Sequence, residues 1–191
     1  IVNVTPDSFS DGGAHFDADA AIAHGLKLAE EGADLLDIGG ESTRPGAGEV
    51  AIEDELRRVI PVIEALAAQL AIPISIDTSK PEVMRAAVEA GAGMINDVFA
   101  LRRDGALDAA AALGVPVVLM HMRGEPRTMQ DAPDYDDVVG EVHRFLAERI
   151  FAAEMAGVAR RNIVVDPGFG FGKTTAHNLQ LLAQLRRFTE L

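Results

Sequence analysis

Polar side chains stand at the carboxyl end of each of six short apolar runs in the sequence. These residues, called the polar rim below, are Asn3, Asp37, Asp77, Asn96, Asp97, His121 and Asp166. A carboxylate accepts the paired N–H groups of an aminopyrimidine, and an asparagine side chain matches an edge that both donates and accepts. The rim therefore has the chemistry to recognise a flat heterocycle, and Asp77, Asn96 and Asp166 are the candidates for that contact.

Two rim residues indicate other chemistry. The carboxamide oxygen of Asn3 is a suitable ligand for a hard cation such as Mg2+, which keeps most of its waters and bridges to phosphates. His121 has the ring of a general base or a metal ligand, but no second histidine or carboxylate stands at ligand spacing around it. A histidine hydrogen-bonded within the rim is therefore the favoured interpretation. Capping of the following helix explains any single Asp or Asn equally well, so only the whole set indicates a site.

Two segments are unusually rich in glycine and hydroxyl side chains. Residues 5–16 read TPDSFSDGGAHF, and residues 39–48 read GGESTRPGAG. Plain turns do not need this length, and long loops in compact domains are often functional. Ser42, Thr43 and Arg44 supply hydroxyls and one guanidinium, which together can grip an oxyanion. We expect both segments to take part in binding.

The stretch DPGFGFGKTT, residues 166–175, has the composition of a phosphate-binding P-loop but not its spacing. A P-loop needs a glycine, four further residues and then Gly-Lys-Ser/Thr, so that successive N–H groups wrap the phosphates. Pro167 occupies the position of that first glycine, and proline has no N–H to donate. Asp166 is therefore the main functional candidate of this stretch, with Lys173 in a lesser role through its charge.

Six apolar runs alternate with longer helical patterns, which predicts six βα units. The runs are Ile1–Val4, Leu35–Ile38, Ile72–Ile76, Met94–Ile95, Val115–Met120 and Ile163–Val165. Glycine ends several helical segments, in EEGAD, EAGAG, ALGVP and MAGVA, as expected of a left-handed C-cap. Helical stripes at a spacing of three to four comprise Val139, Val142, Leu146, Ile150 and Ala153, and then Leu181, Leu182, Leu185 and Phe188. Pro61 should kink the second helical segment or start a new one.

Uniform βα alternation means a parallel sheet, either open or closed into a barrel. An open sheet concentrates its site at one switch point, whereas a barrel gathers side chains from many strands around one mouth. Because rim residues follow all six runs, the predicted fold class is α/β, a TIM (β/α)8 barrel truncated to about its first six βα units. A full barrel has eight units, so the closing two are expected to be missing.

Composition narrows the classes of partner. The chain has 191 residues, 48% of them apolar, and a net charge of −13; that charge argues against nucleic acid or an anionic membrane. Acidic residues in helical segments, such as Glu53, Asp54 and Glu55, are expected to form a solvated face. No apolar stretch approaches the roughly 20 residues of a membrane span. The sequence has no cysteine, which excludes disulfides and fits a cytoplasmic location.

These motifs together resemble those of the dihydropteroate synthase family, the folate-pathway enzymes that sulfonamides target. The matching segments are NVTPDSFSDGG (3–13), DIGGESTRPGA (37–47), IDTSKPEV (76–83), INDV (95–98), LMHMRGEPRTMQ (119–130) and DPGFGFGKT (166–174). They are collinear and cover essentially the whole chain. Several run to ten or so residues, which makes the resemblance far more specific than a lone glycine motif.

The resemblance implies a TIM barrel that condenses 6-hydroxymethyl-7,8-dihydropterin pyrophosphate with p-aminobenzoate, giving dihydropteroate and pyrophosphate with the help of Mg2+. It implies that Asp77, Asn96 and Asp166 hydrogen-bond the pterin ring, and that Met120 and Phe171 help to wall its pocket. Asp77 would also act catalytically, by stabilising the positive charge that develops on the pterin when pyrophosphate leaves.

The resemblance also assigns the anionic end of the substrate. Asn3 would bind Mg2+ on the pyrophosphate, and Thr43 and Arg44 would contact the pyrophosphate or the aminobenzoate side, with Asn3 and Arg44 counted as catalytic. The residues that would belong to the two loops completing the aminobenzoate site are Phe9, Ser42 and Pro45.

One departure from the family pattern concerns the last two strands. The family's Ser-Arg-Lys motif and Arg-x-His segment lie there, and neither is present in this sequence. We therefore expect residues 1–191 to be a single pterin-binding barrel domain, incomplete at both ends, that is inactive alone, within a parent that is an active homodimer. Two alternatives stay open: a pterin-binding domain of a methyltetrahydrofolate–corrinoid methyltransferase, and a non-catalytic pterin-binding homologue.

Overall fold

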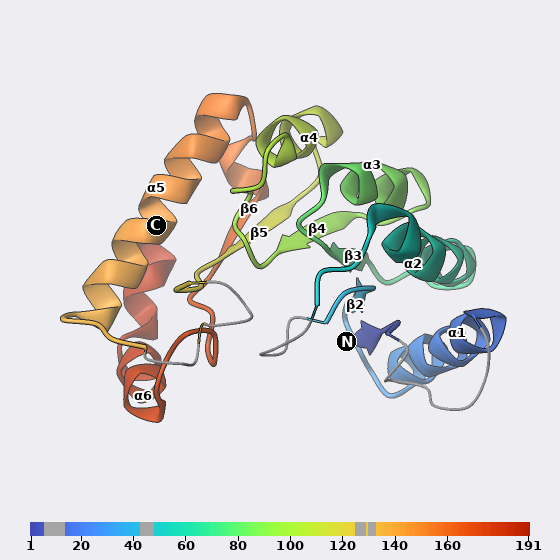
Figure 1. Ribbon diagram of the computed structural model, residues 1–191, viewed down its shortest axis with the longest axis horizontal. Helices are drawn as coiled ribbons and strands as arrows, with labels where there is room; N and C mark the ends of the chain where they lie inside the picture. Colours follow the sequence, from blue (N-terminus) through green and yellow to red (C-terminus); the bar gives the residue numbers. More distant parts are fainter. Residues whose placement is uncertain (6–13, 43–47, 125–128, 130–132) are drawn as a thin grey trace. The chain divides into compact units, whose positions relative to one another are not determined.

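Short strands alternate with helices along the whole chain (Figure 1). The structure is a computed structural model that describes residues 1–5, 14–42, 48–124, 129 and 133–191. Within those residues the strands are β1 (Val2–Asn3), β2 (Leu36–Gly39), β3 (Ile74–Asp77), β4 (Met94–Asp97), β5 (Val117–Met120) and β6 (Ile163–Asp166). The α-helices are α1 (Ala14–Glu30), α2 (Ile52–Ala67), α3 (Pro81–Glu89), α4 (Ala106–Leu113), α5 (Val138–Ala156) and α6 (Thr175–Ala183). Two 3-10 helices span Arg160–Asn162 and Leu185–Glu190.

The strands form a parallel sheet in chain order, β1-β2-β3-β4-β5-β6. All six predicted apolar runs are strands, with ends that lie within two residues of the prediction. Parallel neighbours need a crossover connection, and a helix supplies each one. The prediction of repeated βα units is therefore confirmed.

The connections from helix to strand follow the glycine pattern of the sequence. The four predicted C-cap glycines all have positive φ, at Gly32, Gly91, Gly114 and Gly157. Gly157, for example, ends α5 with φ of 106° and donates its N–H back to the last turn. Pro61 does not start a new helix, because α2 continues through this residue.

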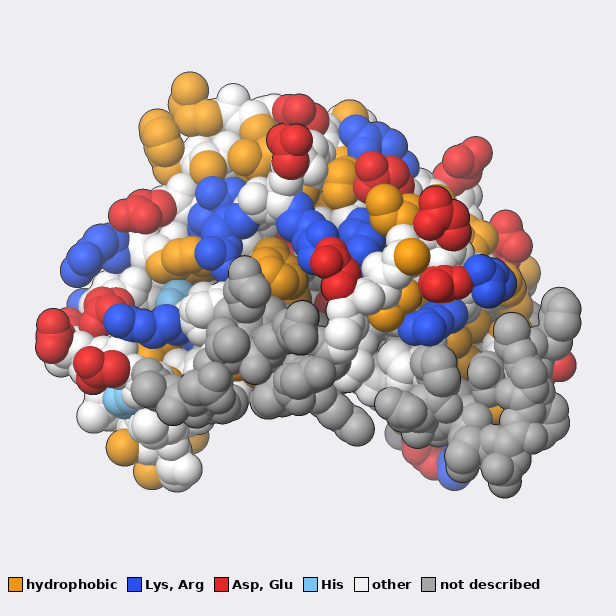
Figure 2. Space-filling view, viewed as in Figure 1, with side chains coloured by type: hydrophobic (Ala, Val, Ile, Leu, Met, Phe, Trp, Pro, Cys, Tyr) orange, Lys and Arg blue, Asp and Glu red, His pale blue; other side chains and the backbone are white. Residues whose placement is uncertain are grey.

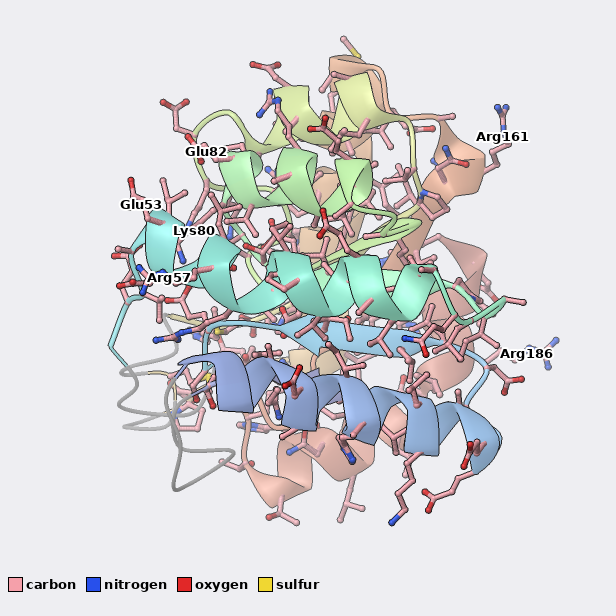
Figure 3. The ribbon with its side chains drawn as sticks, turned by 90° about the vertical axis from the view of Figure 1, so that its right-hand side faces the viewer. Glu53, Arg57, Lys80, Glu82, Arg161 and Arg186 are labelled. Atoms are coloured by element: carbon pink, nitrogen blue, oxygen red, sulfur yellow. The ribbon has the colours of Figure 1, made fainter. Side chains whose placement is uncertain are left out.

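The chain divides into two compact units, which are described separately; the first comprises Ile1–Ser42 and Glu49–Asn96. In this unit α1, α2 and α3 lie side by side (Figure 3). Ile38, Ile76 and Ile95 stand in register on β2, β3 and β4 and are fully buried. Successive strand residues point to opposite faces of a sheet. Asp37, Asp77 and Asn96, which neighbour these isoleucines in sequence, therefore lie on the other face.

The second unit contains Asp97–Leu191. Its core joins Val138, Val139, Val142 and Leu146 of α5 to Leu181 and Phe188. The predicted α5 stripe is buried along its whole length. The second predicted stripe is only half right, since Leu182 is 59% exposed and Leu185 40% exposed. The helical period changes between these residues, because α6 ends at Ala183 and a 3-10 helix follows.

The surface carries charges of both signs. On the face shown in Figure 2, Asp and Glu side chains are interspersed with Lys and Arg side chains rather than separated by sign. Among the helices of the described residues, none is long and apolar enough to cross a membrane.

Candidate functional site

Four residues at the carboxyl ends of β1 to β4 stand in one register row, called the strand-end row below. Asn3 is paired with Gly39, Gly39 with Asp77, and Asp77 with Asn96. A Cβ at Gly39 would lie 3.5 Å from Asp77 Oδ2 and 3.8 Å from Asn3 Oδ1. The missing side chain of Gly39 therefore leaves a space that a carboxylate and a carboxamide border directly. The rim prediction did not single out this glycine.

Asp37 and Ser75 occupy the next layer on the same face of the strands. They pair in register, two residues before Gly39 and Asp77. Ser75 Oγ donates to Asp37 Oδ1 at 2.5 Å, and Asn96 Nδ2 donates to Asp37 Oδ2 at 3.2 Å. Burial raises the pKa of Asp37, while the hydrogen bonds from Ser75 and Asn96 oppose that rise. Asp37 thus connects the layer below to one end of the strand-end row.

A buried ionic cluster lies beside this row and is formed by Glu41, Glu55, Thr78 and Lys80. Lys80 Nζ donates to Glu41 Oε2 and to Glu55 Oε2, and Thr78 Oγ1 donates to Glu55 Oε1 at 2.6 Å. Glu55 is fully buried and Lys80 is 4% exposed. Burial alone would lower the pKa of Lys80, but its hydrogen bonds and charge contacts with Glu41 and Glu55 raise it on balance.

Two further hydrogen bonds are made by Glu41 and by the residue before it. Val50 N donates to Glu41 Oε1 at 3.2 Å, and Arg58 Nη1 donates to Gly40 O at 2.8 Å. Lys80 itself is the N-cap residue of α3. It lies near the amino-terminal end of α2, which carries Glu53 and Arg57 (Figure 3). The expectation of a solvated acidic face is therefore wrong for Glu55. The signal was present in its apolar spacing, since Glu55 stands four residues before the buried Val59.

In the second unit, the ends of β5 and β6 bring Met120 and Asp166 into register. His121 N donates to Asp166 O at 2.9 Å and so extends the pairing by one residue. Gly168 N donates to Asp166 Oδ1 at 2.7 Å, which fixes the carboxylate at the start of the glycine-rich stretch. Asp166 therefore caps the turn that follows it and not the next helix, whose N-cap residue is Thr174.

Gly168 is required by its surroundings. Its φ is +69°, and a Cβ there would lie 1.9 Å from His121 O. Such a contact excludes every side chain, because real Cβ atoms do not approach a carbonyl oxygen so closely. The glycine therefore lets the loop after β6 lie directly against the end of β5.

Lys173 holds the same loop from inside. Its Nζ lies 2.8 Å from Gly168 O, 2.9 Å from Phe171 O and 2.9 Å from His121 Nδ1, and it is 3% exposed. Burial lowers the pKa of Lys173 to about 7. Burial, assisted by the charge of Lys173, lowers the pKa of His121 to about 3. Lys173 thus faces its own loop, which contradicts a direct role in binding an anion and agrees with the rejection of a P-loop.

An apolar cluster lies beside Asp166 in the second unit. Met120 packs with Val98, Met122 and Met129, and Phe99 and Phe171 pack against this cluster. The structure therefore brings together Met120 and Phe171, the two residues expected to wall a pocket.

The remaining predicted site residues lie either in the first unit or outside the described residues. Asn3, Asp77 and Asn96 share the strand-end row, while Ser42 is half-buried in the same unit. Four predicted residues lie outside the described residues: Phe9, Thr43, Arg44 and Pro45. The predicted residues that the structure describes thus form one local group in each unit.

The donor set for a cation is sparse. Within the described residues no group of three or more His, Asp or Glu side chains is arranged to hold a metal ion. Asn3 is exposed and its Oδ1 borders the space beside Gly39. Mg2+ commonly takes only one or two protein oxygens and fills its octahedral sphere with water and substrate phosphates. Asn3 therefore fits a Mg2+ ion that arrives with a phosphate ligand, and it does not fit a permanently enclosed ion.

With this geometry in view, residues 1–191 match the family model described as pterin binding enzyme. The match covers the whole chain, so the chain belongs to this family of pterin-binding enzymes.

The relatives are more specific. The chain is 55% identical to the dihydropteroate synthase of Escherichia coli K12 over 188 residues, which are 98% of this chain and 67% of the relative. It is 74% identical to a solved dihydropteroate synthase of Xanthomonas albilineans with 4-aminobenzoic acid, with a TM-score of 0.93 and coverage of 100% and 67% of the two chains. A structure of the enzyme from the same species in complex with 7,8-dihydropteroate gives 69% identity, a TM-score of 0.88 and coverage of 99% and 66%. The chain thus spans about two thirds of these relatives, and its α/β barrel class is confirmed.

Proposed function

We propose that this protein is a dihydropteroate synthase, a transferase that joins 6-hydroxymethyl-7,8-dihydropterin pyrophosphate to p-aminobenzoate and releases pyrophosphate. The observation that carries the proposal is the strand-end row, in which the carboxamide of Asn3 and the carboxylate of Asp77 border a space left by Gly39, and Asn96 follows as the register partner of Asp77. The solved relatives with 4-aminobenzoic acid and with 7,8-dihydropteroate support the same substrate class.

The pterin contact is assigned to the strand-end residues that the sequence singled out. Asp77, Asn96 and Asp166 hydrogen-bond the ring, since carboxylates and a carboxamide match its N–H groups and ring nitrogens. Met120 and Phe171 supply the apolar wall, which is supported by their shared cluster. A flat ring with polar edges needs this combination of apolar faces and a few polar contacts.

The anionic end of the substrate is assigned to Asn3 and the two glycine-rich segments. Asn3 would hold Mg2+, and the bound ion would neutralise charge on the departing pyrophosphate. Thr43 and Arg44 contact the pyrophosphate or the aminobenzoate side. The residues that complete the aminobenzoate site from the two segments are Phe9, Ser42 and Pro45.

The reaction needs no strongly activating base. The bond between the pterin methylene carbon and oxygen breaks, and pyrophosphate leaves with the electron pair. The methylene carbon is then a carbocation conjugated with the ring, which the nearby carboxylate of Asp77 stabilises. The amine nitrogen of p-aminobenzoate donates its lone pair to form the new C–N bond, and its extra proton passes to water. A site of carboxylates and carboxamides without a catalytic triad suits this chemistry.

Two other functions remain to be distinguished by experiment. A pterin-binding methyltransferase domain would use the same ring contacts but has no need of the segments STRP and TPDSFSDGG. A non-catalytic pterin-binding homologue would bind the pterin pyrophosphate without turnover. A cytoplasmic location and a homodimeric assembly are further proposals, the first supported by the absence of cysteine from the sequence.

Pyrophosphate release by the full-length protein separates these functions. For a synthase, release requires Mg2+, the pterin pyrophosphate and p-aminobenzoate together. Equal release without the amine contradicts the proposal, and so does binding without any release. Methyl transfer from methyltetrahydrofolate to a corrinoid, measured with the same preparation, identifies the methyltransferase.

A further inference from the structure

We infer that Asp37 is a positioning residue that fixes the carboxamide orientation of Asn96 and thereby sets which hydrogen-bonding group the site offers to its ligand. The inference rests on the proposed function, because it treats Asn96 as a pterin contact. Asp37 itself stands one layer below the strand-end row, on β2, and reaches past β3 to Asn96 on β4.

The two contacts of Asp37 divide its oxygens between two donors. Oδ1 accepts from Ser75 Oγ at 2.5 Å, and Oδ2 accepts from Asn96 Nδ2 at 3.2 Å. An ionised carboxylate only accepts hydrogen bonds. The amide nitrogen of Asn96 must therefore face Asp37, since the opposite orientation would set an amide oxygen against a carboxylate oxygen.

Orientation of the amide decides what Asn96 offers elsewhere. With Nδ2 held by Asp37, Oδ1 occupies the other branch of the carboxamide and is an acceptor. Asp77, the register partner of Asn96, carries a carboxylate, which is also an acceptor when ionised. The β3–β4 end of the strand-end row thus presents acceptors side by side, which selects a ligand edge rich in N–H donors, as a reduced pterin provides.

Ser75 keeps Asp37 in place for this task. Its backbone pairs in register with Asp37, and the residue is 2% exposed. A buried hydroxyl donates a hydrogen bond to a nearby carboxylate. Ser75 and Asn96 therefore donate to different oxygens of the Asp37 carboxylate and hold it in one orientation. The chain Ser75–Asp37–Asn96 is therefore a continuous orienting network within the first unit.

A double-mutant cycle on ligand affinity tests this network. In the full-length protein, the dissociation constant for 6-hydroxymethyl-7,8-dihydropterin pyrophosphate is measured by calorimetry for wild type, Asp37→Asn, Asn96→Ala and the double variant. The carboxamide introduced by Asp37→Asn can turn its NH2 group toward Asn96 and so reverse the Asn96 amide. We expect the affinity to fall by about 10-fold, the effect of one hydrogen bond. In the Asn96→Ala background the same change should alter the affinity less than about 2-fold.

A matched control and a second variant separate positioning from a general structural effect. Asp34→Asn replaces an exposed aspartate just before β2 and should leave the affinity unchanged. Ser75→Ala keeps Asp37 and Asn96 but frees one carboxylate oxygen, so it should weaken binding by a smaller factor that also vanishes in the Asn96→Ala background. Equal losses in both backgrounds, or no loss on the wild-type background, overturn the inference. Wild type that fails to bind this ligand overturns the proposed function itself.

Discussion

Lys80→Met tests whether the buried ionic cluster supports the first unit. Lys80 donates to two carboxylates, Glu41 and Glu55, and only Glu41 has appreciable exposure, at 22% of its side chain. Methionine has nearly the length of lysine but no charge and no donor. The substitution therefore leaves Glu55 fully buried without the lysine charge, while Thr78 Oγ1 still donates to it at 2.6 Å.

The expected loss follows from that uncompensated charge. Removing one partner of a buried ion pair costs about 3–5 kcal/mol, because the remaining charge keeps its desolvation penalty. Replacing both partners with apolar residues is often nearly neutral. Lys80→Met should therefore lower the free energy of unfolding by about 3–5 kcal/mol, and adding Glu55→Leu should restore most of the loss.

Urea unfolding of the full-length protein at pH 7, followed by circular dichroism, measures these free energies. Lys27→Met is the matched control, since Lys27 pairs with Glu31 across 3.6 Å on an exposed helix face and should cost no more than about 0.5 kcal/mol. A loss for Lys80→Met no larger than that of the control would refute the reasoning. A double variant that is less stable than Lys80→Met would refute it as well.

Two further predictions concern the loop after β6. His121 has a folded-state pKa near 3 against about 6.5 when unfolded, so its contribution to stability is present above pH 6.5 and is lost as the pH falls toward 3. Between pH 7 and 5.5, wild type should lose about 1 kcal/mol relative to His121→Asn in urea unfolding, whereas parallel losses would contradict the assignment. Gly168→Ala should destabilise by about 2–4 kcal/mol, because its Cβ would meet His121 O, while Gly170→Ala should cost only about 1–2 kcal/mol, since a Cβ there meets no atom within 4 Å. Equal thermal shifts for the two glycine variants would show that the close approach is relieved elsewhere.

The sequence predicted the strands and the polar residues at their ends because both depend on local pattern. An apolar run of strand length followed by Asp or Asn is visible in the sequence alone. Asp77 and Asn96 were identified in this way, and the structure adds that they are register partners on β3 and β4. The glycine C-caps were predicted for the same reason, since a helix end needs only a few neighbouring residues.

The features that the sequence did not reveal depend on contacts between distant residues. Lys80 and Glu55 stand 25 positions apart, so the helical spacing of Glu55 could indicate its burial but could not identify Lys80 as its partner. Gly39 matters because it lacks a side chain and so leaves a space between Asn3 and Asp77. The sequence motif does not show which residues border that space. The charge of Lys173 suggested an anion contact. Its actual partners, in its own loop and at His121, can be identified only from the structure.

The central claim is that the strand-end row binds the pterin of a dihydropteroate synthase. The most direct measurement is kcat/KM for dihydropteroate formation, with Mg2+, by full-length wild type and by Asp77→Ala and Asn96→Ala variants whose urea unfolding matches wild type. We predict that wild type forms dihydropteroate and pyrophosphate in equal amounts, and that each variant loses at least about 10-fold in kcat/KM, as expected when a contact to the reacting ring is removed. Wild-type rates in both variants, or no dihydropteroate from wild type, would contradict the account.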